Sequence, residues 1–221
     1  MHKRMRKYPR VQSRVLIFLA LYGPSSPYDV AREEDLCRSS VSKALEALKR
    51  DGRVLVARKS RARSGVRKRI YKISIHSLIE VLRGCKDVDT ARAIIYRNAE
   101  RLPFVFGKWD LFRKRGVEDL AFRILRGFSW AGWTGEPFKN KPGTRGYEEE
   151  YAEYFQYSFF LLAHDLLSRE EFDKWMSVIT ADDDICRFFH EQLAKEKEVY
   201  MSRARELEEL ERLLAQTLND P

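Results

Sequence analysis

The sequence predicts a mainly α-helical protein in which three short helices are followed by one two-stranded hairpin and then by an all-helical region ending in a long helix. Three observations support this prediction. The apolar residues Val41, Ala44, Leu45 and Leu48 have the i, i+3, i+4, i+7 spacing of an amphipathic helix. Two strand-like segments follow directly, and helical periodicity then recurs to the end of the chain. Charge also divides the chain, because residues 1–86 carry 22 Lys/Arg against 7 Asp/Glu, a net of +15, whereas the remainder has a net of −6.

These features predict a basic arm at residues 1–9, a first domain at 10–84 and a helical domain at 85–221. The arm is rich in cations, including Lys3 and Arg4, and contains no acid. Such an arm could follow phosphates or enter a minor groove, and it could equally be a solubilising tail.

The first three helices are expected at residues 10–22, 27–33 and 38–51. Gly23-Pro24 ends the first helix, and Ser26 with Pro27 starts the second as N-cap and first helical residue. Gly52 closes the third helix. A short helix, a tight turn and a second helix form the plan of a helix-turn-helix.

The exposed face of the third helix combines short hydroxyls with cations, which can reach base edges and phosphates in a groove. We expect base contacts from Arg38, Ser39, Ser42 and Lys43, and a backbone contact from Lys49.

The strands are expected at residues 54–58 and 69–74, joined by a turn marked by Ser64-Gly65. No acidic residue lies between Gly52 and Ile79. Self-repulsion of so many cations favours a wing that contacts the phosphate backbone over an ordinary hairpin with a solvated loop. The expected backbone contacts, besides the arm and the third helix, are Arg58, Lys59, Arg61, Arg63, Arg67, Lys68 and Arg69.

Residues 10–75 resemble the winged helix-turn-helix domain of prokaryotic transcription regulators of the MarR, PadR and ArsR-like groups. The resemblance is carried by residues 15–23, 28–32 and 38–52 and by the basic wing. It implies that the third helix enters the major groove and that the wing touches the flanking backbone. Cys37 stands where such domains often place Ser or Thr as N-cap, and it is interpreted as a buried or semi-buried cysteine rather than an oxidation sensor.

Further helices are expected at residues 76–84, 87–102, 116–128, 147–167, 169–180 and 184–218, with a long loop at 129–146. Ser168 and Glu171 have the spacing of a capping box. The carboxylates at 182–184 are interpreted as a helix N-terminus rather than a metal site.

The last helix repeats apolar residues every seven positions, which favours a dimer seam over an intramolecular bundle helix. The expected dimerisation residues are Leu193, Tyr200, Leu207, Leu210 and Leu214. Of the 27 aromatic residues, 22 lie after residue 86, and a large aromatic core explains them better than a pocket for an apolar effector.

The sequence predicts no cofactor and no metal, because its three cysteines and four histidines lack metal-ligand spacing. The expected function is a non-enzymatic regulator of transcription that binds duplex DNA as a homodimer in the prokaryotic cytoplasm, associated with the nucleoid. A non-specific or architectural DNA-binding protein is the main alternative. A nuclease using residues 148–150 or 182–184 is a weaker one, since no nucleotide-binding glycine loop or nucleophile elbow is present. No apolar run reaches 18 residues, so no membrane span is expected.

Overall fold

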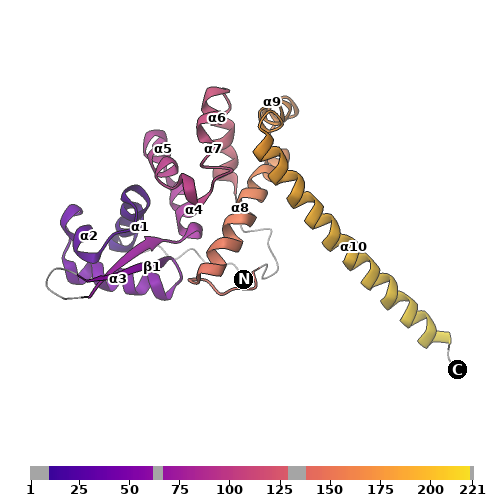
Figure 1. The fold of residues 1–221 in the computed structure, drawn as a ribbon, viewed down its shortest axis with the longest axis horizontal. Helices are drawn as coiled ribbons and strands as arrows, with labels where there is room; N and C mark the ends of the chain where they lie inside the picture. The colour runs from indigo at the N-terminus through magenta and orange to yellow at the C-terminus, as the bar shows by residue number, and fades with distance from the viewer. Residues whose placement is uncertain (1–9, 62–66, 129–137, 220–221) are drawn as a thin grey trace. The chain divides into compact units, whose positions relative to one another are not determined.

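The computed structural model describes residues 10–61, 67–128 and 138–219. It confirms a mainly helical chain with one two-stranded antiparallel sheet (Figure 1). The chain divides into two compact units, residues 1–175 and 176–221. Helices on both sides of the predicted boundary at residues 84 and 85 pack within the first unit, so that boundary stays a prediction.

The first unit begins with α1 (Arg10–Tyr22), α2 (Pro27–Glu33) and α3 (Arg38–Arg50), at the predicted positions. Both α1 and α2 contact α3, and the apolar stripe of α3 is buried. Ser26 and Asp29 form the capping box that starts α2. Because these signals are local in the sequence, the three helices are also the most predictable part of the fold.

The hairpin pairs β1 (Val54–Arg61) with β2 (Arg67–Ile73), and a bulge lies between Val56 and Arg58. Gly52, with a left-handed φ of 69°, turns the chain from α3 into β1. An isolated β-bridge joins the turn before α2 to β2. The Ser25 N–H donates to the Tyr71 carbonyl at 2.9 Å, and the Tyr71 N–H donates to the Ser25 carbonyl at 2.8 Å. The base of the hairpin is therefore held by backbone contacts on two sides.

Within the described residues of the first unit, five further α-helices and one 3-10 turn follow, and a sixth α-helix, α9, runs across the unit boundary. They are α4 (Ile75–Gly84), α5 (Val88–Arg97), η1 (Ala99–Arg101), α6 (Trp109–Lys114), α7 (Glu118–Gly127), α8 (Arg145–Leu166) and α9 (Arg169–Ile179). The core between α6, α8 and α9 is aromatic. Its fully buried side chains are Trp109, Phe112, Phe159 and Trp175, and the centroids of neighbouring rings lie 5.0–6.4 Å apart. This packing confirms the expected aromatic core.

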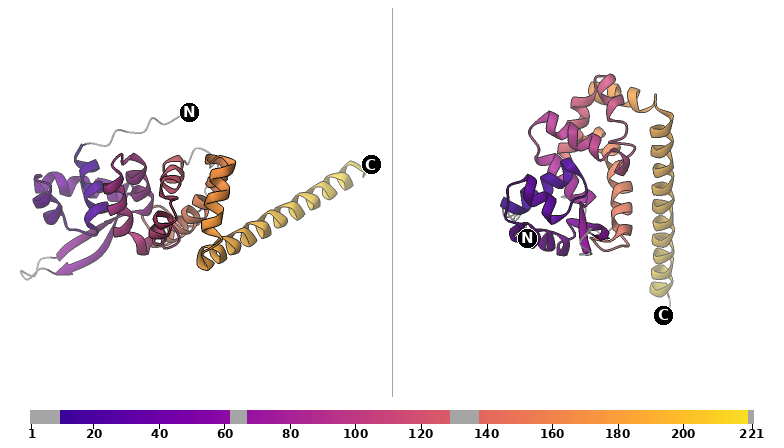
Figure 2. Two further views of the ribbon diagram at one scale, coloured as in Figure 1. Left: turned by 90° about the horizontal axis from the view of Figure 1, so that it is seen from above. Right: turned by 60° about the vertical axis from the view of Figure 1, so that its left-hand side comes forward.

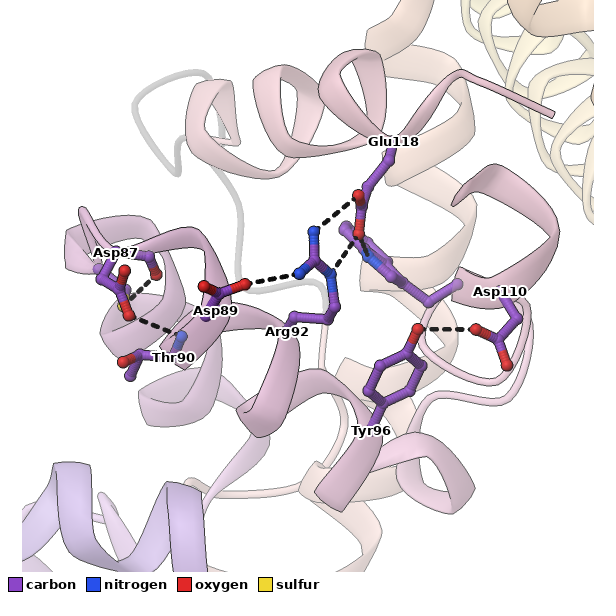
Figure 3. A network of polar contacts seen from close by, with 9 residues as sticks. Asp87, Asp89, Thr90, Arg92, Tyr96, Asp110 and Glu118 are labelled. Carbon is purple, nitrogen blue, oxygen red and sulfur yellow. Dashed lines mark hydrogen bonds and ion pairs between the residues drawn. The ribbon is translucent and has the colours of Figure 1, made fainter. Parts of the chain in front are cut away.

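A polar network joins α5, α6 and α7 (Figure 3). Arg92 of α5 binds both carboxylate oxygens of Glu118 at 2.9 and 3.0 Å, and the indole N–H of Trp109 donates to the same carboxylate at 2.9 Å. These bonds, led by the one from Arg92, hold the pKa of Glu118 below its ordinary value. Tyr96 adds a 2.7 Å hydrogen bond to Asp110, so each of the two later helices is tied to α5.

A buried ion pair links the end of the hairpin to α8. Glu148 of α8 accepts from the Ile75 backbone N–H at 2.9 Å and from Arg101 at 3.2 Å, while Arg101 also donates to the Ile73 carbonyl at 2.8 Å. Burial raises the pKa of Glu148 and lowers the pKa of Arg101. Both shifts have the sign expected when desolvation outweighs the attraction within a buried pair.

One prediction about this region was wrong, and one helix was missed. The helix expected at residues 87–102 ends at Arg97, because the Asn98 side chain bonds the Ile94 and Ala20 carbonyls and the chain tightens into η1. Helix α6 was missed, because its six residues are too few to show a period. Most of the loop predicted at residues 129–146 falls outside the described residues, and α8 begins within it at Arg145.

The second unit, residues 176–221, holds the end of α9 and the single continuous helix α10 (Asp183–Asn219) (Figure 2). The predicted caps of α9 and α10 are confirmed. Ser168 and Glu171 exchange backbone and side-chain hydrogen bonds of 2.9 and 3.3 Å, and Asp182 accepts from the Ile185 N–H at 3.0 Å.

Candidate nucleic-acid interface

Helix α3 separates an apolar face from a polar one. Val41, Ala44, Leu45 and Leu48 are buried against the rest of the first unit. The polar face is open to solvent along the helix: Arg38, Ser39, Lys43 and Lys49 are exposed, and Ser42 is half-buried. All five residues predicted to meet DNA from this helix therefore share its accessible side.

The N-terminus of α3 carries an exposed thiol, so the expectation that Cys37 is buried or semi-buried was wrong: as N-cap it lies at the solvent-facing end of the helix. Cys37 occupies the N-cap position but makes no side-chain cap hydrogen bond, and its Sγ lies 3.1 Å from the Ser39 Oγ. This hydrogen bond, helped by the backbone N–H groups of Ser39 and Ser40, lowers the pKa of the Cys37 thiol. The thiol therefore shares the start of the helix with two of the predicted base-reading residues.

The turn between α2 and α3 is fixed from α1. The Arg14 guanidinium donates to the Glu34 carboxylate at 2.9 Å and also to the Glu34 backbone carbonyl. Asp35, with a φ of 48°, takes the left-handed conformation that reverses the chain before α3. These contacts set the angle at which α3 leaves the turn.

One acidic residue on α3 binds the base of the hairpin. Glu46 accepts a 2.6 Å hydrogen bond from the Tyr71 hydroxyl and a 2.9 Å charged hydrogen bond from Arg69, both on β2. Lys49, one turn along α3, lies 3.8 Å from the same carboxylate. The Tyr71 bond is the main cause that lowers the pKa of Glu46, and the two cations act in the same direction.

This contact gives Arg69 a partner within the protein. The sequence placed Arg69 among the backbone-binding cations, whereas the structure engages its guanidinium with Glu46, with about half of each side chain exposed. Tyr71 is buried beneath the pair, and burial raises the pKa of its hydroxyl. Glu46, Arg69 and Tyr71, here called the wing latch, fasten the hairpin to the helix that carries the polar face.

Sequence reasoning did not single out Glu46. A signal was available, because Glu46 is the only acid between Asp35 and Asp51 in an otherwise basic stretch. An acid within such a basic stretch suggests that its carboxylate has a structural partner.

The other predicted backbone contacts lie on the hairpin or outside the described residues. Arg58 is exposed on β1. Strand pairing sets Lys59 opposite Arg69 and Arg61 opposite Arg67, and it includes Lys68. The side chains of Lys59, Arg61, Arg67 and Lys68 lie outside what the structure describes, as do Lys3, Arg4 and Arg63 entirely.

The predicted dimerisation residues lie on α10. Leu193, Tyr200, Leu207 and Leu210 are 43%, 65%, 66% and 55% exposed. The side chain of Leu214 is outside the described part of the chain. A row of large apolar residues left this accessible is typical of a binding surface.

The acidic clusters considered for a nuclease have separate partners. Glu148 faces Arg101, Glu149 binds Arg145 at 2.7 Å, and Glu150 binds Asn140 at 2.7 Å. Within residues 10–61, 67–128 and 138–219, no group of three or more His, Cys, Asp or Glu side chains is placed to hold a metal ion.

The chain matches no protein-family model, and neither curated proteins nor solved structures give a significant match. In the described part of the chain, none of the helices has the length and apolar character needed to cross a membrane.

Proposed function

We propose that this chain is a sequence-specific DNA-binding regulator of transcription. The observation that carries the proposal is the position of the acid-free hairpin beside α3, whose solvent-facing side holds hydroxyls and cations. Helix α3 would enter the major groove, where its side chains read base edges, and the hairpin would lie along the flanking phosphates. A protein of net charge +15 in residues 1–86 gains affinity for any duplex by releasing counterions.

The proposal separates reading from attachment. Arg38, Ser39, Ser42 and Lys43 would discriminate between bases, at about 1–3 kcal/mol for each good bidentate contact. The hairpin cations, the arm and Lys49 would bind phosphates without regard to sequence. Self-association through the exposed row on α10 would place two such modules on one operator, in the prokaryotic nucleoid.

Selection of bound sequences from random duplex DNA tests the proposal. A clean motif with two-fold symmetry supports a dimeric regulator, and equal affinity for unrelated duplexes would instead support the architectural alternative. No duplex binding even at low salt would refute both.

Variants sharpen this test. The triple variant Arg61→Ala, Arg63→Ala, Arg67→Ala should weaken binding to all sequences and flatten the salt dependence, whereas Lys43→Ala should alter the selected motif. Lys114→Ala is a matched control, because Lys114 is exposed at the end of α6, away from α3 in the first unit (Figure 1).

A further inference from the structure

Helix α10 carries an exposed seam whose charges distinguish between orientations of a second copy. The seam consists of two rows that alternate three and four residues apart, the spacing of a coiled-coil interface. One row holds Leu193, Tyr200 and Leu207, and the other holds Glu196, Arg203 and Leu210. All six side chains are exposed, and an open apolar groove of about 470 Å³ runs along this face between Leu193 and Ala204.

We infer that α10 binds α10 of a second copy of the chain in antiparallel orientation. The inference rests on the proposed self-association through this helix, but it does not depend on DNA binding. It follows from where the charged seam residues would lie in each of the two orientations.

In a parallel pair in register, each seam residue faces its own copy. Glu196 would then meet Glu196 and Arg203 would meet Arg203, so like charges would oppose one another at two levels of the seam. The flanks add a third conflict, because a parallel coiled coil sets Glu206 beside Glu211 of the other helix.

In an antiparallel pair, residues of one row pack against residues of the other. When Leu193 is level with Leu210 of the second copy, Tyr200 is level with the second copy's Arg203. Glu196 then lies about 6 Å along the axis from that arginine, four residues of helix rise, which is within reach of both long side chains. The symmetry repeats every contact, so both charged residues gain an opposite charge.

The flanks agree with this orientation. Reversal of one helix moves Glu211 away from Glu206 of the second copy, so this like-charge contact is lost. Glu196, Lys197 and Glu211 are all exposed on α10 and therefore accessible to a partner helix. Glu196 and Arg203 each face a like charge in the parallel pair and lie near an opposite charge in the antiparallel one, which is why the second copy is expected to lie antiparallel.

Charge reversal in the full-length protein tests the orientation. Sedimentation equilibrium in the absence of DNA should show a dimer, and Glu196→Arg or Arg203→Glu should each raise the dimer dissociation constant about tenfold or more, because like charges then meet. The double variant should return it towards the wild-type value. Glu198→Arg and Arg205→Glu, on exposed positions outside the seam, are the matched controls and should leave it unchanged.

A distance measurement provides a second, independent readout. Cys186 is exposed near the start of α10, and spin labels can be placed there alone in the variant Cys37→Ser, Cys85→Ser. The antiparallel pair separates the two labels by roughly 45 Å along the axis, whereas a parallel pair holds them at about the 8–10 Å spacing of packed helices.

The outcomes are distinct. A monomer at high concentration overturns both the self-association and the orientation. A dimer with closely spaced labels, insensitive to the charge reversals, overturns the orientation alone. DNA selection with the same preparations shows separately whether the proposed DNA binding holds.

Discussion

Replacement of Glu46 by Gln tests whether the wing latch restrains a phosphate-binding cation. In the native protein the Glu46 carboxylate accepts from Arg69 at 2.9 Å and from Tyr71 at 2.6 Å. A glutamine can still accept the tyrosine hydrogen bond, but it does not attract the guanidinium by charge. Arg69 is then free to bind a phosphate, and a negative charge beside the DNA is removed.

The size of the effect follows from one added phosphate contact. Each neutralised phosphate steepens the dependence of log affinity on log salt by about 0.9. Between 50 and 200 mM salt, a fourfold change, the Glu46→Gln variant should therefore lose about 3.5 times more affinity than the native protein loses. At the low-salt end it should bind more tightly than the native protein.

Fluorescence anisotropy with a labelled duplex, titrated over a series of salt concentrations, measures this slope. Arg69→Gln should change the native slope little, because its charge is already engaged, but in the Glu46→Gln background it should remove the added 0.9. Glu149→Gln removes the same charge from an exposed ion pair on α8 and is the matched control. If Arg69→Gln alone flattens the native slope by a full contact, Arg69 already binds phosphate and the wing latch does not restrain it.

Three further predictions concern the first unit. Gly52→Ala should lower the free energy of unfolding by about 1–2 kcal/mol in urea denaturation, since Gly52 has a left-handed φ and a Cβ there would meet Pro142 at 3.0 Å. Gly84→Ala, where a Cβ meets nothing within 4 Å, should cost nothing. Ser39→Ala should raise the pKa of Cys37 and slow its alkylation at neutral pH, as mass spectrometry of the labelled peptide can show; an unchanged rate would contradict the assigned hydrogen bond. Glu148→Ala should destabilise the fold by about 2–4 kcal/mol, because the Ile75 N–H and the partly buried Arg101 both lose their acceptor. Burial raises the pKa of Glu148 in the folded state, so protonation of Glu148 stabilises the fold. This stabilisation is complete below the pKa of Glu148 in the unfolded state, and it is lost as pH rises through the pKa in the folded state. The variant should lack this decline, and an identical pH profile would count against it.

The sequence predicted those elements whose signals are local. Gly23 and Gly52 mark helix ends through their own backbone conformation, and Ser26 caps the helix that it precedes. Contacts between distant segments were not predictable in the same way. Glu148 reads as one of three consecutive acids on a helix, and only the packing of α8 against the hairpin end buries it against Arg101.

The same distinction applies within the candidate interface. The two faces of α3 follow from periodicity, so the base-reading residues could be proposed from the sequence alone. The sequence did not show which hairpin cation binds Glu46 and which are left for phosphates, because this depends on which strand position packs against α3. Register pairs Arg69 with Lys59, two positions nearer the base of the hairpin than the Arg61–Arg67 pair, and the Arg69 side chain contacts Glu46.

The contact between Glu46 and the hairpin would separate affinity for DNA from sequence specificity. One acid on α3 holds the base of the hairpin in place, while no acid occurs in the sequence of the hairpin beyond it. The cations furthest from Glu46 would then bind phosphates without regard to sequence. The wing latch would fix the position of these cations relative to the polar face of α3. Substitutions at Arg61 and Arg67 should therefore change affinity without changing the selected motif, whereas loss of Glu46 should change the salt slope and also broaden the motif at its flanks. If the DNA motif selected by the Glu46→Gln variant is unchanged at its flanks, α3 takes its position on DNA without help from the hairpin.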